Sequence, residues 1–153
     1  MPEVADLSFR SRHIGRALGR LFWIFEDKVL SGLVDAGFDD VRRGDLDLIR
    51  LLPREGARAT TLAERAVMTK QGMGKLIAGA TERGLVTRRP DPDDGRAQLV
   101  ALTRRGLRLV KTAGKIVATL ETDWARRVGA AELDAVRQTC LALADALDGP
   151  DYL

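Results

Sequence analysis

The segment between Gly84 and Thr103 constrains the fold of this chain more than any other. It reads GLVTRRPDPDDGRAQLVALT, with two short strand-like runs joined by a tip of proline, aspartate and glycine that also carries Arg96. Turn-forming residues between two such runs indicate a β-hairpin. Because the residues before Gly84 show helical spacing, we predict a hairpin that directly follows a helix.

The size and composition of the chain exclude several classes of protein. Its 153 residues suffice for one compact domain, or for a small binding module with additional helices for association. With 45% hydrophobic and 31% charged residues, the chain is expected to fold. The N-terminus lacks a signal-peptide pattern and no apolar run approaches a membrane span, so we expect a cytoplasmic protein without a membrane partner.

The residues that most often carry chemistry are scarce. One cysteine, Cys140, and one histidine, His13, are too few for an intramolecular disulfide framework or a Cys/His metal site. The sequence contains no Ser/His/Asp or Cys/His constellation and no phosphate-binding Gly-x-x-x-x-Gly-Lys motif. We therefore expect neither an enzyme nor a bound metal or cofactor.

Apolar residues recur at three- and four-residue spacings near both ends of the chain. They predict a long helix from about Ser8 to Asp35, ended by Gly37, and a second from about Arg104 to Val128. A last helix follows Gly129. The first helix is too long for one small domain to cover, so we expect a second subunit to bury it.

The central part of the chain predicts a helix-turn-helix followed by the hairpin. Thr60 or Thr61 is expected to cap the first helix of the motif, Thr69 to cap the second, and Gly84 to end it. The predicted elements are a helix over 42–52 that ends before Pro53, a loop or very short strand over 54–59, and helices over 61–67 and 70–83. In such an arrangement the first turn of the second helix can enter the major groove of DNA.

The basic residues are concentrated in this central part. From Arg54 to Arg105 the chain has 11 Lys/Arg and 6 Asp/Glu, a net charge of +5, whereas the remainder has a net charge of −2. A solvated surface can also produce such a distribution. The excess nevertheless favours a phosphate-binding surface and thus double-stranded DNA as a partner.

The order of the elements and several short motifs resemble the MarR (multiple antibiotic resistance regulator) family. The motifs are LAE at 62–64, GLV at 84–86, RR at 88–89, DP at 91–92, DGRA at 94–97 and LTRRG at 102–106. The resemblance implies a mainly α fold with a small β-hairpin wing, that is, an α+β winged helix-turn-helix. Within the single chain 1–153 it implies a DNA-binding region over 38–103 and dimerisation helices over 8–37 and 104–150.

The resemblance also implies a function. Such a protein is a homodimeric transcriptional regulator, usually a repressor, that binds a pseudo-palindromic operator and responds to a small aromatic or anionic effector. A winged helix used only for protein association, with no operator, is the alternative. An enzyme is a more distant one.

The resemblance assigns candidate DNA-binding residues by position. Gln71 can bond to an adenine edge, Lys70 and Lys75 can reach guanine or phosphate, and Thr69 also fits a purely capping role. Arg96 at the wing tip suits the narrow minor groove, although a solvated turn residue is the simpler alternative. The full set is Thr69, Lys70, Gln71, Lys75, Arg88 and Arg96, with Asp94 as the brace of the wing. Arg88 and Arg89 alternate along a strand, so at most one of them faces the duplex.

Three further groups of residues have two interpretations each. Asp91, Asp93 and Asp94 could form a metal or acid/base cluster, but a turn rich in aspartate and proline is commoner. Cys140 could sense oxidants, yet its place on an apolar stripe favours a small buried hydrophobe. His13, Arg16 and Trp23 could bind an anionic effector, or could simply belong to a solvated or dimer-forming face.

Overall fold

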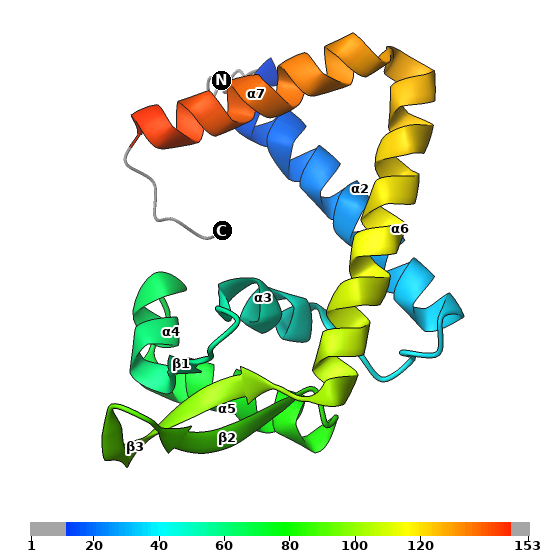
Figure 1. Ribbon diagram of the computed structural model, residues 1–153. Coiled ribbons are helices and arrows are strands. Elements are labelled where there is room, and N and C mark those ends of the chain that lie inside the picture. The colour runs from blue at the N-terminus through cyan, green and yellow to red at the C-terminus, as the bar shows by residue number, and fades with distance from the viewer. Residues whose placement is uncertain (1–11, 148–153) are drawn as a thin grey trace, which may run out of the picture.

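The computed structural model describes residues 12–147, and Figure 1 shows that they form two parts. The long helices α2, α6 and α7 make one part, and the short helices with the sheet make the other. The elements are α2 (Ile14–Asp35), α3 (Arg43–Leu51), β1 (Ala57–Arg58), α4 (Ala59–Arg65), α5 (Lys70–Glu82), β2 (Val86–Asp91), β3 (Asp94–Leu102), α6 (Arg104–Val128) and α7 (Ala130–Ala146). The predicted helical segments at 8–11 and 148–150 lie outside the described residues.

The hairpin forms as predicted and gains a third strand. The sheet is antiparallel in the order β1-β3-β2, with Ala57 opposite Val100 and Val86 opposite Leu102. The register shifts between Pro90 and Asp91, close to the tip. The segment predicted as a loop or short strand is thus a two-residue edge strand, and the fold is mainly helical with a small antiparallel sheet.

The helix-turn-helix consists of α4 and α5. Thr69 caps α5 as predicted, because its hydroxyl oxygen accepts the N–H of Gly72 at 3.0 Å. Gly84 follows α5 with a positive φ of 65°, which favours glycine. The predicted threonine cap of α4 is wrong: α4 begins at Ala59 after Arg58, whose side chain makes no capping bond. Arg58 pairs with β3, so the chain passes directly from strand to helix.

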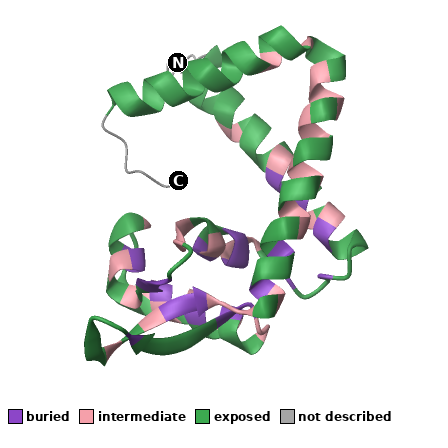
Figure 2. Cartoon of the chain, in the orientation of Figure 1, coloured by how far each residue is buried: buried purple, intermediate pink, exposed green. Residues whose placement is uncertain are grey.

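One hydrophobic core supports the helix-turn-helix and the sheet. Met73, Ile77 and Ala80 of α5 are buried, while Leu76 is half-buried. Burying a side chain such as leucine or isoleucine stabilises the fold by about 1.5–3 kcal/mol. Val29 and Leu33 of α2 and Leu109 of α6 join the same core, which links the two parts of the molecule (Figure 2).

Two buried carboxylates form ion pairs between helices. Asp45 of α3 is 1% exposed and accepts two bonds from Arg83, at 2.8 and 2.6 Å, as well as the N–H of Arg42. Glu26 of α2 is 2% exposed and pairs with Arg43 at 2.8 Å and Arg50 at 2.5 Å. These ion pairs connect α3 to α2 and to the end of α5.

Much of the apolar surface of the terminal helices is uncovered in the single chain. Within the described residues α7 has no buried residue, and Figure 2 shows it turning away from α6 after Gly129. Cys140 is exposed, so its predicted burial is wrong for the single chain, because no other described element covers its face of α7. The exposed side chains include Ile14, Leu18, Leu21, Phe22, Trp23, Val128, Val136, Leu143 and Leu147. Over residues 12–147, no helix combines the length and apolarity that crossing a bilayer requires.

Candidate nucleic-acid interface

The N-terminal end of α5 presents four polar side chains to solvent. Thr69, Lys70, Gln71 and Lys75 are all exposed, and the first turn of α5 contains no acidic residue. Gln71 and Lys75 are four residues apart and therefore share one face of the helix. An exposed helix N-terminus with two lysines attracts phosphate groups through its free N–H groups and its charge.

The two arginines of β2 have different surroundings. The guanidinium of Arg89 donates a hydrogen bond to the backbone carbonyl of Glu55. Arg88 is exposed, and its guanidinium has no hydrogen bond or ion pair with any residue between 12 and 147. Both side chains are exposed, and Arg88 is the one of the pair whose guanidinium makes no polar contact with the described part of the chain.

Asp94 holds the tip of the wing. One of its carboxylate oxygens accepts the backbone N–H of Arg96 at 3.1 Å, and the other lies 3.4 Å from a guanidinium nitrogen of Arg58. The side chain of Arg96 itself is exposed. Asp94 thus orders the backbone that carries Arg96, and the side chain it pairs with is Arg58.

Asp91 holds the other side of the tip and is 6% exposed. One oxygen accepts the N–H of Asp93 at 3.0 Å, and the other accepts the Nε of Arg58 at 2.8 Å. The N–H of Asp93 and the hydrogen bond from Arg58 hold the pKa of Asp91 below its ordinary value. Asp91 and Asp94 each bond to a backbone N–H two residues on, as in Asx turns, which fits the turn interpretation of this cluster.

Comparison with known proteins identifies the family. The sequence profile of the MarR family matches residues 39–97, from the approach to α3 through most of the hairpin. The HTH-type transcriptional regulator MT0903.1 of Mycobacterium tuberculosis is 31% identical over 109 residues, which are 69% of this chain and 76% of that protein. The chain belongs to the MarR family.

Other relatives agree with this assignment. The transcriptional regulator HosA of Escherichia coli O111:H- is 31% identical to this MarR-family chain over 85 residues, and the match spans 63% of the length of HosA. The crystal structure of CouR from Rhodococcus jostii RHA1, bound to p-coumaroyl-CoA, has a TM-score of 0.66 and 26% identity over 88% of this chain and 93% of that one. The predicted winged helix-turn-helix fold is confirmed, and the curated relatives are regulators rather than enzymes.

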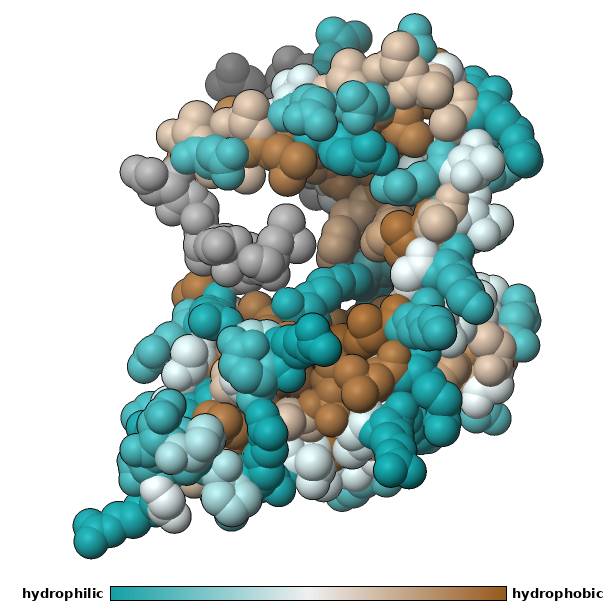
Figure 3. Space-filling view, viewed as in Figure 1, coloured by the Kyte–Doolittle hydropathy of each residue, from teal (hydrophilic) through white to brown (hydrophobic). Residues whose placement is uncertain are grey.

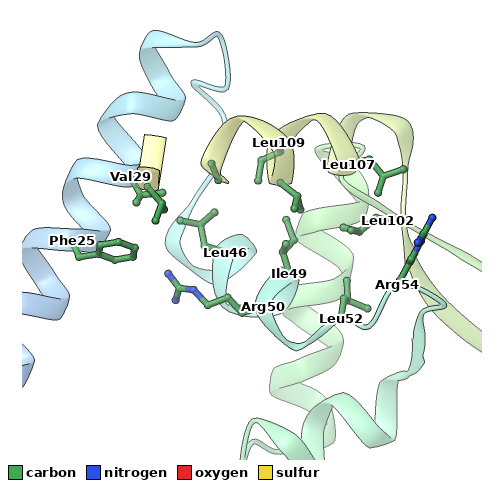
Figure 4. Close-up of a pocket in the computed structure, with 13 residues that line it drawn as sticks. Phe25, Val29, Leu46, Ile49, Arg50, Leu52, Arg54, Leu102, Leu107 and Leu109 are labelled. Atoms are coloured by element: carbon green, nitrogen blue, oxygen red, sulfur yellow. The ribbon is translucent and has the colours of Figure 1, made fainter. Parts of the chain in front are cut away.

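This MarR-family chain has an apolar cavity of about 500 Å³ between α2, α3 and α6. Figure 4 shows Arg50 on one side of it, near Phe25, and Arg54 on the other, near Leu52. In Figure 3, apolar surface gathers over α3 and the adjoining end of α6, where the cavity lies. The lining residues are Phe25, Val29, Leu46, Ile49, Arg50, Leu52, Arg54, Leu102, Leu107, Leu109, Val110, Ala113 and Val117. Sequence periodicity identified the helices but gave no sign of the cavity between them.

The three residues predicted to bind an effector lie outside this cavity. His13, Arg16 and Trp23 line an open depression on the exposed face of α2, and none of them borders the apolar cavity. The ring of Trp23 lies 4.8 Å from the guanidinium of Arg43, a cation–π contact. The structure therefore brings the three residues together on α2, outside the apolar cavity.

Proposed function

We propose that this chain is a sequence-specific, DNA-binding transcriptional regulator that acts as a homodimer. The observation that carries the proposal is the exposed, acid-free N-terminal turn of α5 beside a wing with an exposed arginine at its tip, in a chain of the MarR family. Residues 38–103 form the proposed DNA-binding region. In the proposed complex, Lys70, Gln71 and Lys75 contact the major groove and its phosphates. Arg88 contacts the DNA backbone beside the major groove, and Arg96 enters the minor groove.

The dimer is proposed from the uncovered apolar side chains of the terminal helices. Trp23 is 58% exposed on α2, and Leu147 at the end of α7 is 70% exposed. Large contiguous apolar surfaces on a folded chain mark sites of association. A second copy is the occupant that a two-fold operator requires, with half-sites about 34–36 Å apart.

Replacing Arg96 with alanine tests the DNA-binding proposal. We expect the Arg96→Ala variant to bind its operator roughly tenfold to a hundredfold more weakly, because one groove contact contributes about 1–3 kcal/mol. The duplex is the one that the wild-type protein enriches from a random library, and affinity is measured by fluorescence anisotropy at physiological salt. Light scattering checks that the variant keeps the mass of a dimer. Unchanged affinity would remove Arg96 from the interface.

The apolar cavity is the proposed effector site, and the regulator is proposed to be a repressor that the effector releases. Arg54 suits a ligand with an apolar body and a negative group, whereas Arg50 already pairs with Glu26 and Asp47. CouR, a structural relative, was crystallised with p-coumaroyl-CoA. We expect aromatic carboxylic acids to raise the unfolding temperature, since a ligand at about 100 times its Kd adds about 2.7 kcal/mol. Ala113→Met, which fills the cavity, should abolish the shift, whereas Arg16→Ala should not. The opposite pattern would favour the α2 depression, and no shift with any acid would contradict the proposal.

A further inference from the structure

We propose that Arg58 is a positioning residue for DNA binding, which aligns the wing with the helix-turn-helix through Asp91 and Asp94. This inference rests on the proposed DNA-binding function. Arg58 belongs to β1, outside the hairpin, and is also the residue that immediately precedes α4. One side chain therefore joins the start of the helix-turn-helix to the tip of the wing, 33 residues further along the chain.

Two nitrogens of the Arg58 guanidinium contact the carboxylates of the wing tip. Nε lies 2.8 Å from Asp91, and one terminal nitrogen lies 2.6 Å from the same carboxylate and 3.4 Å from Asp94. The backbone of Arg58 is held as well, because it pairs with Leu99 of β3. The side chain thus leaves a fixed strand and ends on two carboxylates near the turn.

The carboxylates of Asp91 and Asp94 also bind the backbone of the wing tip, the part that is proposed to face DNA. Asp91 accepts the N–H of Asp93, and Asp94 accepts the N–H of Arg96. The carboxylate of Asp94 therefore connects the guanidinium of Arg58 to the backbone N–H of Arg96. Charge-assisted hydrogen bonds of this kind are the strongest polar contacts available to order a turn.

Arg58 also changes the charge that the wing presents to DNA. Asp91, Asp93 and Asp94 bring three negative charges to the tip, where phosphates would repel them. The guanidinium neutralises part of this charge while it holds two of the three. Without Arg58, Asp91 would be nearly buried without a cation, and we expect the tip to rearrange so that water reaches it.

A double-mutant cycle between Arg58 and Asp91 tests the inference. We expect Arg58→Met to weaken binding of the selected duplex by roughly tenfold to a hundredfold, the effect of losing one hydrogen bond between charged groups. Asp91→Asn should have a similar effect. If both substitutions act by breaking the ion pair between Arg58 and Asp91, the double variant should bind the duplex no more weakly than the single variant with the lower affinity. Arg126→Met removes an exposed arginine at the far end of α6 and should change the affinity less than twofold.

Independent measurements separate positioning from direct contact or general damage. Hydrogen exchange at the amides of Asp93 and Arg96 should be faster in Arg58→Met, with the helical amides of α6 unchanged. If the losses of the two single variants multiply in the double variant, Arg58 contacts the phosphates itself and the inference is wrong. It is also wrong if Arg58→Met binds like the wild type. A wild-type protein that enriches no duplex would instead contradict the proposed function as a whole.

Discussion

Replacing Gly106 with alanine is expected to lower the free energy of unfolding by about 3 kcal/mol, the upper end of the usual range for overpacking. A β-carbon at Gly106 would lie far inside van der Waals contact with the carbonyl oxygen of Leu85, and 3.0 Å from a methyl group of Leu102. The carbonyl cannot easily move, because it accepts hydrogen bonds from the N–H of Thr103 at 3.0 Å and from its hydroxyl at 3.2 Å. Gly106 is the point where α6 packs against the chain entering the wing.

Gly114 provides a matched control in the same helix. A β-carbon there would meet nothing within 4 Å, so Gly114→Ala should stabilise the protein by about 0.5–1 kcal/mol through helix propensity alone. Urea unfolding at one fixed protein concentration measures both variants. Equal stabilities for the two alanine variants would show that the approach of α6 to Leu85 is not tight.

Replacing Asp45 with alanine is expected to lower the free energy of unfolding by about 3–5 kcal/mol, the loss found when one partner of a buried ion pair is removed. The guanidinium of Arg83 would lose both of its bonds to Asp45, and the N–H of Arg42 would lose its acceptor at the start of α3. Asp45 is 1% exposed, so water cannot replace its carboxylate without a rearrangement of α3 and α5.

Asp123 is the control for the loss of a carboxylate that pairs with arginine. It pairs with Arg127 four residues along α6 at 3.2 Å, on the surface, where such pairs contribute about 0.3–0.5 kcal/mol. Asp123→Ala should therefore unfold almost like the wild type in urea. A loss below about 1 kcal/mol for Asp45→Ala would mean that the α3–α5 ion pair adds little to the fold.

The helices whose bounds the sequence predicted best are those with a capping threonine at the start and a glycine at the end. Thr69 and Gly84 bracket α5, and the helix observed over Lys70–Glu82 agrees with the prediction to within one residue. The observed α6, Arg104–Val128, has the predicted bounds because Thr103 caps its start and Gly129 ends it. The prediction for α4 was wrong because pairing of Arg58 in the sheet, a contact across the fold, decided where that helix begins.

The candidate site divides in the same way. Lys70, Gln71, Lys75 and Arg96 were assigned by position from the resemblance to the MarR family, and the structure leaves all four exposed. Arg58 was missed, since nothing near it in sequence relates it to the wing. The apolar cavity was missed as well, because its lining residues have the same helical spacing as core residues.

The sequence by itself determined the order of the elements, the wing and the MarR-type helix-turn-helix, because caps, turns and hydrophobic spacing act over a few residues. Only the tertiary structure decided which carboxylates are buried, that Arg58 joins β1 to the wing tip, and that residues of α2, α3 and α6 line a common cavity. These features depend on residues brought together from distant parts of the chain. Ion pairs and packing contacts between residues far apart in the sequence produce no periodic pattern in a single sequence.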